Sequence, residues 1–318
     1  MKTINFSMFS AVLLLAWSLP APAGSVSPAT NGIAGAPITL NPALSTCACT
    51  NPVFVTSDTN GGWSNGGYYV HNNMWNASSG ETLFACAYNN WYVTANYPNT
   101  TDVKTYPNVH EDINNPKGVP LDNYHTIAST FAARTPHVGI YDVAYDIWLN
   151  GVGGGRGTTE FMIWTENYKQ VPLGSVQAYP AFEGMSYRAY HYTGGGANVI
   201  TLVPVNVITS GNLNLKAMFD WAINQGWMPS NPTLNQICYG VEICSTGNQA
   251  ATFCFTDFSV RLKWIMANLW SQSTWWPALP QLTTDLGVAS KQMAKKMFAI
   301  NFTRICKSGL FDSPMEIT

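Results

Sequence analysis

The sequence has little charge of either sign, and this shortage restricts what the chain can be. Only 10% of its 318 residues are Asp, Glu, Lys or Arg, and the formal net charge is -2. Nucleic-acid binding needs a basic surface, so we expect no nucleic-acid partner. The hydrophobic fraction of 46% is enough for a large core and argues against disorder.

Long apolar runs are also scarce, and the one that stands out lies near the N-terminus, from Phe6 to Leu19. It follows Lys2 and precedes the small residues Ala21–Pro22–Ala23, a pattern typical of a secretory signal peptide over residues 1–23. The alternative is a membrane anchor, but the run is shorter than the ~20 apolar residues that a span needs. We therefore expect a secreted, extracellular protein that has no membrane contact once the signal is removed. We also expect a monomer, although no pattern in the sequence indicates an oligomeric contact.

The five histidines show no spacing typical of metal ligands, so we expect no metal site and no organic cofactor. The seven cysteines become candidates for disulfides if the protein is exported, and an odd number leaves at least one unpaired within a monomer. Cys244 and Cys254 flank a turn and are one candidate pair, with Cys238 as a competitor. The sequence does not decide between these pairings.

Glycine, proline and aromatic residues are abundant, which favours many short strands joined by tight turns and therefore an all-β fold. One segment differs, because Leu215, Met218, Phe219, Ala222 and Ile223 recur at helical spacing between Asn214 and Gly226. We expect this single helix to pack on the outside of a sheet. Strand-like runs lie at Tyr68–Val70, Leu83–Ala87, Trp91–Ala95, Thr126–Ala132, Tyr141–Leu149, Thr159–Trp164, Met185–Tyr192, Asn198–Val205, Ile237–Cys244 and Ala251–Arg261.

After the expected signal peptide at residues 1–23, these patterns divide the rest of the chain into three parts. Residues 24–46 are rich in Ser, Pro, Ala, Gly and Thr, and they read as a flexible lead-in. Residues 47–262 are expected to form one β-sandwich domain. Residues 263–318 form a tail of unknown role, aromatic at first and helical and basic over Val288–Phe298. Packing on the domain, an appendage and an imperfect gene model all remain open for this tail.

Two glutamates interrupt apolar strands, and they are the first candidates for chemistry. Side chains alternate along a strand, so Glu160 shares one face with Met162 and Trp164. Glu242 likewise interrupts an apolar strand, Tyr239–Cys244. A carboxylate in such surroundings must be paired, neutralised or functional. The other five glutamates neighbour Gly, Asn, Asp or a terminus, and we expect them to be solvated.

Two carboxyl groups in an aromatic-lined β cleft are what glycoside hydrolysis requires: one attacks the anomeric carbon and the other protonates the leaving oxygen. The alternative for either glutamate is a structural acid satisfied by a Tyr hydroxyl or an Arg. A third acid, Asp146, shares a strand face with Asp142 and Trp148. Placed near Glu160, Asp146 would affect its protonation, because like charges at close range do not both ionise cheaply. Its structural alternatives are a loop cap or a pair with Arg156.

Five motifs occur in an order that resembles glycoside hydrolase family 12, over about Cys47 to Leu262. They are Asn72–Asn73–Met74–Trp75, Val103–Lys104–Thr105–Tyr106–Pro107–Asn108, Tyr145–Asp146–Ile147–Trp148–Leu149, Glu160–Phe161–Met162–Ile163–Trp164 and Gly240–Val241–Glu242. The resemblance implies a β-jelly roll of two antiparallel sheets with a concave substrate cleft and one packed helix. It also implies hydrolysis of internal β-1,4-glucosidic bonds with retained configuration, for which the carboxyls must lie about 5–5.5 Å apart.

Carried over by position, the resemblance makes Glu160 the nucleophile, Glu242 the general acid/base and Asp146 the acid that supports the nucleophile. Asn73 and Trp75 match sugar-contacting residues, Met162 lies beneath the reactive sugar, and Pro172 matches a proline at the edge of the cleft. Trp148 and Trp164, on the faces of these acids, are further substrate-binding candidates. Cys86 matches one half of a family disulfide, with Cys49 or Cys47 as its partner.

This sequence departs from the family pattern at Asn76, where glycine is usual, and at Cys244, where an aromatic residue is usual; neither change touches the two glutamates. The leading hypothesis is a secreted endo-β-1,4-glucanase that acts on cellulose-type glucan, mixed-linkage β-glucan or xyloglucan. A non-catalytic carbohydrate-binding protein on the same fold is the alternative. A xylanase on a related jelly roll is disfavoured by the run Glu160–Trp164.

Overall fold

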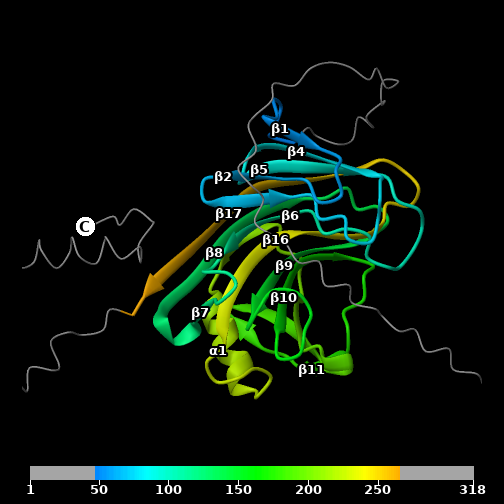
Figure 1. Ribbon diagram of the computed structural model, residues 1–318. Helices are drawn as coiled ribbons and strands as arrows, with labels where there is room; N and C mark the ends of the chain where they lie inside the picture. The colour runs from blue at the N-terminus through cyan, green and yellow to red at the C-terminus, as the bar shows by residue number, and fades with distance from the viewer. Residues whose placement is uncertain (1–46, 266–318) are drawn as a thin grey trace, which may run out of the picture. The chain divides into compact units, whose positions relative to one another are not determined.

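A computed structural model describes residues 47–265, and these form a sandwich of two β-sheets (Figure 1). The expected signal peptide, the lead-in and almost all of the expected tail lie outside the described residues. The last strand continues to Trp264, two residues beyond the expected domain end at Leu262. Within the described part of the chain, no helix is long and apolar enough to cross a membrane.

The first sheet has six strands, and all of its pairings are antiparallel. At its centre lies the longest of the described strands, which is also the last of them along the chain. Its spatial order is β1 (Phe54–Thr56), β4 (Glu81–Ala87), β5 (Asn90–Ala95), β17 (Ala251–Trp264), β8 (Tyr124–Arg134) and β15 (Ser210–Leu213).

The second sheet has eleven strands and carries the candidate acids. Its only parallel pairing among the described strands joins β10 and β14. Two short strands lie off the main path: β12 (Ala181–Phe182) pairs with β13, and β7 (Val119–Pro120) with β16. The main order is β11 (Ser175–Ala178), β13 (Met185–Tyr192), β14 (Val199–Pro204), β10 (Thr159–Tyr168), β9 (Ile140–Leu149), β16 (Thr233–Ser245), β6 (Asn108–Asp112), β3 (Tyr68–His71) and β2 (Gly62–Asn65).

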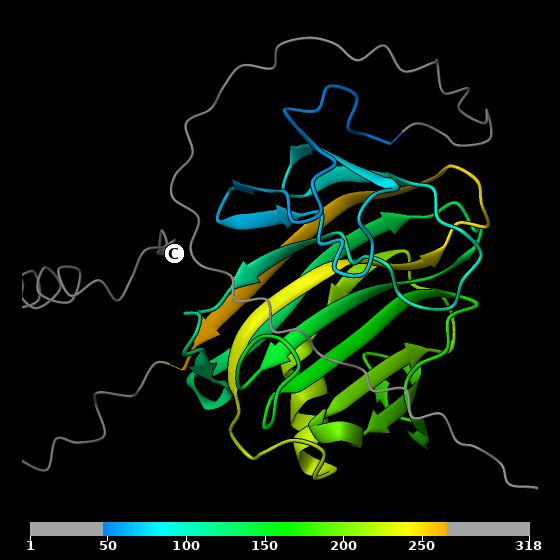
Figure 2. The ribbon, with the colours of Figure 1, turned by 45° about the vertical axis from the view of Figure 1, so that its right-hand side comes forward.

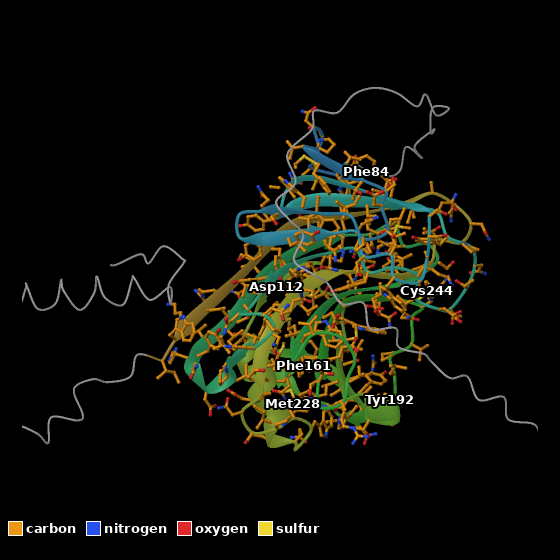
Figure 3. All side chains as sticks on the ribbon, in the orientation of Figure 1. Phe84, Asp112, Phe161, Tyr192, Met228 and Cys244 are labelled. Atoms are coloured by element: carbon orange, nitrogen blue, oxygen red, sulfur yellow. A yellow bond between two sulfur atoms is a disulfide. The ribbon has the colours of Figure 1, made fainter. Side chains whose placement is uncertain are left out.

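The core fills the space between the two sheets with alternate side chains from each strand (Figure 3). Aromatic rings dominate it: Trp91 stacks on Phe255 with ring centroids 4.1 Å apart, and Tyr145 lies 4.6 Å from Tyr239. Burial of large rings from both sheets supplies most of the hydrophobic stabilisation of such a sandwich. The predicted all-β jelly-roll class is confirmed.

The predicted helix is present as α1 (Leu215–Asn224), and its start follows the expected chemistry. The side chain of Asn214 caps it by accepting a hydrogen bond from the backbone N–H of Ala217 at 3.2 Å. Its apolar face packs inward, where Phe219 meets Phe161 of β10 edge to face at 5.1 Å. The helix therefore covers part of the core side of the eleven-stranded sheet, and the prediction of a single packed helix is confirmed for the described residues.

Two disulfides form among the described cysteines, and they correct one expectation. Cys86 pairs with Cys49, one of its two candidate partners. Cys254 pairs with Cys47, whereas the sequence suggested Cys244 or Cys238 for it. Cys238 and Cys244 are buried free thiols on β16. The position of Cys244 and Cys254 on either side of a turn therefore did not predict the disulfide pairing, because the spatial arrangement of the strands sets which sulfurs meet.

Candidate active site

The acids predicted from the sequence lie on the face of the eleven-stranded sheet that points away from the sandwich core; we call it the site face. Their strand neighbours Val143, Tyr145 and Ile147 on β9 are fully buried in the core. Side chains alternate along a strand, so the residues between these neighbours face the other way. The site face is built by Asp142, Ala144, Asp146 and Trp148 of β9, Glu160, Met162 and Trp164 of β10, and Cys238, Gly240 and Glu242 of β16.

The strand register places Glu160 and Glu242 on either side of β9. Glu160 is paired with Trp148, and Glu242 is paired with Asp142. These partners are six residues apart, which on a flat strand would separate them by about 20 Å. The long strands of this sheet bend along their length (Figure 2). The two carboxyls are close enough for the charge of Glu242 to raise the pKa of Glu160.

The two glutamates are held in an environment that disfavours their charge. Burial raises the pKa of Glu160 to about 8, and the charge of Glu242 adds to the rise. Burial also raises the pKa of Glu242 to about 7, and the neighbouring side chain of Asp142 acts to lower it. Near neutral pH both protonated and ionised forms are therefore accessible, which acid/base catalysis requires.

Asp146 lies between the two glutamate strands, paired with Met162 on one side and Cys238 on the other. It is 9% exposed, and no ion pair reaches it among residues 47–265. Burial, then the charges of Glu160 and Glu242, raise its pKa well above the usual range, while a hydrogen bond from Trp148 lowers it. The structure thus brings Asp146 together with both glutamates, and neither structural alternative, a loop cap or a pair with Arg156, applies.

Asn73 and Trp75 lie in the loop after β3. The indole of Trp75 is 61% exposed, so its ring is free to meet a ligand. The backbone of Asn73 has a φ of 43°, and its carbonyl accepts a hydrogen bond from the N–H of Tyr106 at 3.0 Å. This loop is therefore tied to the segment before β6.

The other substrate-binding candidates differ in their accessibility. Trp148 is half-buried on the site face. Met162 and Trp164 are buried in a small apolar cluster with Val199. Trp164 therefore shapes the floor of the face and offers no free ring surface. Pro172 is buried in the loop after β10.

Sequence reasoning missed three buried acids. Glu81 is 4% exposed and accepts a hydrogen bond from Thr105 at 2.9 Å; burial raises its pKa to about 8. Glu166 is 5% exposed and accepts from Tyr141 at 2.7 Å. The expectation that these two glutamates are solvated was wrong, since polar chain neighbours do not report what packs on a side chain. Asp142 was placed on the correct face by alternation but given no role; it is fully buried beside Glu242.

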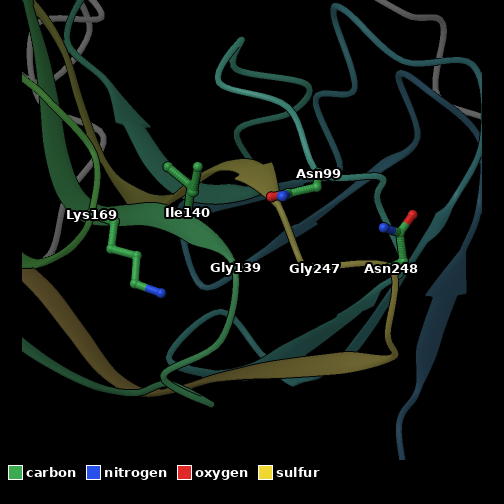
Figure 4. A pocket seen from close by; sticks show the side chains of 6 residues that line it. All are labelled: Asn99, Gly139, Ile140, Lys169, Gly247 and Asn248. Atoms are coloured by element: carbon green, nitrogen blue, oxygen red, sulfur yellow. The ribbon is translucent and has the colours of Figure 1, made fainter.

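A pocket lies at the end of β9 and β16, lined by residues outside the predicted set (Figure 4). Lys169 is its one charged residue, and the ammonium lies 4.8 Å from the ring of Tyr168. The pocket holds no acid that could work with this amine. Within residues 47–265, no group of three or more His, Cys, Asp or Glu side chains is placed to hold a metal ion.

A curved β-sandwich with paired acids on one sheet face is the scaffold of a jelly-roll glycoside hydrolase. Residues 66–263, well over half of the chain, match the family model described as glycosyl hydrolase family 12, and the chain belongs to this family.

Solved structures of the family share this fold. The xyloglucanase domain of NopAA, a type three effector from Sinorhizobium fredii solved in complex with cellobiose, is 26% identical, with a TM-score of 0.57 over 67% of this chain and 100% of that one. A cellulase derived from Cel12A of Rhodothermus marinus is 25% identical, with a TM-score of 0.59 over 66% of this chain and 99% of that one.

A curated relative carries a different description. The inactive glycoside hydrolase XLP1 of Phytophthora nicotianae (strain INRA-310) is 26% identical over 204 residues, which cover 59% of this chain and 84% of that protein. Membership of the family therefore does not by itself establish turnover.

Proposed function

We propose that this protein is a secreted endo-acting hydrolase of internal β-1,4-glucosidic bonds, with retention of configuration. Its substrates are cellulose-type glucan, mixed-linkage β-glucan or xyloglucan. The observation that carries the proposal is that Glu160 and Glu242 share the site face and lie close enough for the charge of Glu242 to raise the pKa of Glu160, as expected of two acids that act on one substrate. The cellulase and xyloglucanase descriptions of the similar structures support the glucan class.

The two glutamates divide the reaction into two steps. Glu160 attacks the anomeric carbon while Glu242 gives its proton to the departing glycosidic oxygen, leaving a covalent glycosyl-enzyme. Glu242 then takes a proton from water, the water oxygen attacks the same carbon, and Glu160 departs as a carboxylate. The pKa values of about 8 and about 7 do not assign these roles, which rest on the family resemblance.

Asp146 supports the nucleophile in this scheme. Its raised pKa favours the protonated form, in which Asp146 can donate a hydrogen bond that stabilises the Glu160 carboxylate. Exposed Trp75 provides a ring for sugar stacking with Asn73 beside it, and Trp148 extends the contact surface. Met162 and Trp164 form the floor, and Pro172 fixes the edge loop. The scheme uses no metal or organic cofactor.

The proposal includes export by a signal peptide at residues 1–23, followed by the lead-in at residues 24–46 and the catalytic domain. Two disulfides in the described domain suit an oxidising compartment. N-terminal sequencing of protein recovered from the culture medium of the native host tests the cleavage site.

A non-catalytic carbohydrate-binding protein is the second candidate, and the inactive relative favours it. Release of reducing ends from carboxymethylcellulose, barley β-glucan and xyloglucan separates the two functions and ranks the substrates. We expect hydrolysis of at least one glucan and a loss of at least about a hundredfold in Glu160→Gln and in Glu242→Gln.

Glu183→Gln is the matched control, because Glu183 is an exposed glutamate between β12 and β13 and is not among the residues that build the site face. Circular dichroism checks that all three variants fold. Ordinary activity in either site variant contradicts the assignment, and binding of the glucans without hydrolysis by the wild type favours the second candidate. Proton NMR of the first-formed anomer tests retention.

A further inference from the structure

Asp142 takes no part in the proposed mechanism, yet it lies beside the proposed acid/base. It is fully buried in β9, directly opposite Glu242 of β16. Neither of its carboxyl oxygens accepts a hydrogen bond from an N–H or O–H group of the described residues. The group that lies within hydrogen-bonding reach is the carboxyl of Glu242. Two carboxyls therefore meet with no donor between them.

Such a contact is stable only if one of the two acids carries a proton. An ionised carboxyl only accepts hydrogen bonds, whereas a protonated one can also donate. A buried carboxylate without a donor or a cation is costly, and a second carboxylate beside it adds repulsion. Asp142 is the more enclosed of the two, because Glu242 is partly exposed on the site face. The proton therefore belongs on Asp142.

We propose that Asp142 stays protonated throughout the reaction cycle and donates a hydrogen bond to Glu242, so that it is a positioning residue for the acid/base. This inference rests on the proposed function for its role in turnover. The hydrogen-bonded pair itself is a property of the folded protein and can be tested without substrate.

The titratable groups around Asp142 agree with a proton on its carboxyl. Burial, then the charge of Glu242, raise the pKa of Asp142 well above the usual range, and Asp146 and Glu160 contribute further. From the segment before β6, Tyr106 donates its hydroxyl hydrogen bond to the carbonyl of Ala144 at 3.0 Å. Lys104 lies 4.0 Å from Asp102. On β16, the thiol of Cys244 has a pKa raised to about 12 by burial, so it stays neutral.

The hydrogen bond has a consequence for the reaction. Burial alone would hold Glu242 protonated, which suits the first step but hinders the second, when Glu242 must act as a base. A donor to the ionised form lowers the pKa of Glu242 and keeps it at about 7. Asp142 thus makes the ionised form of Glu242 accessible after the proton has been given away.

The test compares two substitutions that keep the branched shape of Asp142 and its number of side-chain heavy atoms. Asp142→Asn keeps a donor, whereas Asp142→Leu removes it; Asp142→Val serves where the Leu variant does not fold. Carbon-13 NMR of protein labelled at the glutamate side-chain carboxyls follows the titration of Glu242, assigned as the resonance lost in Glu242→Gln. We expect the midpoint to rise by about one pH unit in the Leu or Val variant. In the Asn variant it should stay within about 0.3 units of the wild type.

Asp122→Ala, which removes an exposed carboxyl from the turn before β8, is the control and should leave the midpoint unchanged. An unchanged midpoint in the donor-free variants overturns the proposal, and so does an equal rise in the Asn variant. In the active enzyme the basic limb of the kcat/KM profile should move with the NMR midpoint. A wild type that hydrolyses no glucan refutes the proposed function but leaves the titration result to decide on Asp142.

Discussion

Glu160→Gln should make the folded protein more stable at alkaline pH while it removes the proposed nucleophile. An unfolded glutamate titrates near 4.5, whereas burial raises the pKa of Glu160 in the fold to about 8. Between these two values the folded chain holds a proton that the unfolded chain has released. Stability therefore falls as pH rises from about 4.5 through about 8, and it is unaffected by this group below that window.

The size of this effect follows from the same two values. The difference between 4.5 and about 8, at about 1.36 kcal/mol per pH unit, sets a ceiling of about 5 kcal/mol. The side chain is partly exposed on the site face, so screening by water reduces the expected gain to about 2 kcal/mol. Replacing Glu160 also removes a charge beside Glu242, and the lost repulsion further favours the stability of the variant at alkaline pH.

Urea denaturation followed by tryptophan fluorescence, with the disulfides intact, measures this gain at pH 4.5 and at pH 8.5. We expect equal stability of variant and wild type at pH 4.5 and about 2 kcal/mol in favour of Glu160→Gln at pH 8.5. Glu183→Gln, at an exposed turn, should show no such pH dependence. A variant that is less stable at pH 8.5, or equally shifted at both pH values, would refute the burial argument.

Two further changes test the scaffold of the site. Opening the Cys49–Cys86 disulfide by the double change to Ser frees a loop with a sequence separation of 37, and should cost about 3–4 kcal/mol of unfolding free energy in urea titrations. Gly240→Ala should lower both stability and activity, because a Cβ there would lie 2.1 Å from the carbonyl oxygen of Pro107 and force β16 away from the segment before β6. An unchanged melting temperature of the Gly240 variant would contradict this reasoning, because it would show that the segment at Pro107 moves aside without a cost in stability.

Sequence reasoning succeeded where one local pattern decided the structure. The helix follows from Asn214 as a cap and from apolar residues at helical spacing, and α1 begins one residue after that cap. The face of Glu160 follows from the alternation within Thr159–Trp164, which lies inside β10. Both signals depend on neighbours in the chain, so no long-range information was needed.

Features that depend on distant segments could not be predicted in this way. Polar strands such as β15 and β2 have almost no apolar alternation, and their strand structure comes from pairing with β8 and β3. The burial of Glu81 comes from Thr105, 24 residues away, and the Cys47–Cys254 pair joins opposite ends of the described domain. The contact between Asp142 and Glu242 requires the register of β9 against β16, which no motif in either strand encodes.

The bond between Cys47 and Cys254 closes a covalent ring with a sequence separation of 207, and the ring includes every strand that carries an acid of the site face. A single cut by a protease in any loop of this ring leaves one molecule, with both pieces still tethered. Such a nicked form would keep its mass on a non-reducing gel and would separate into fragments only after a thiol reductant is added.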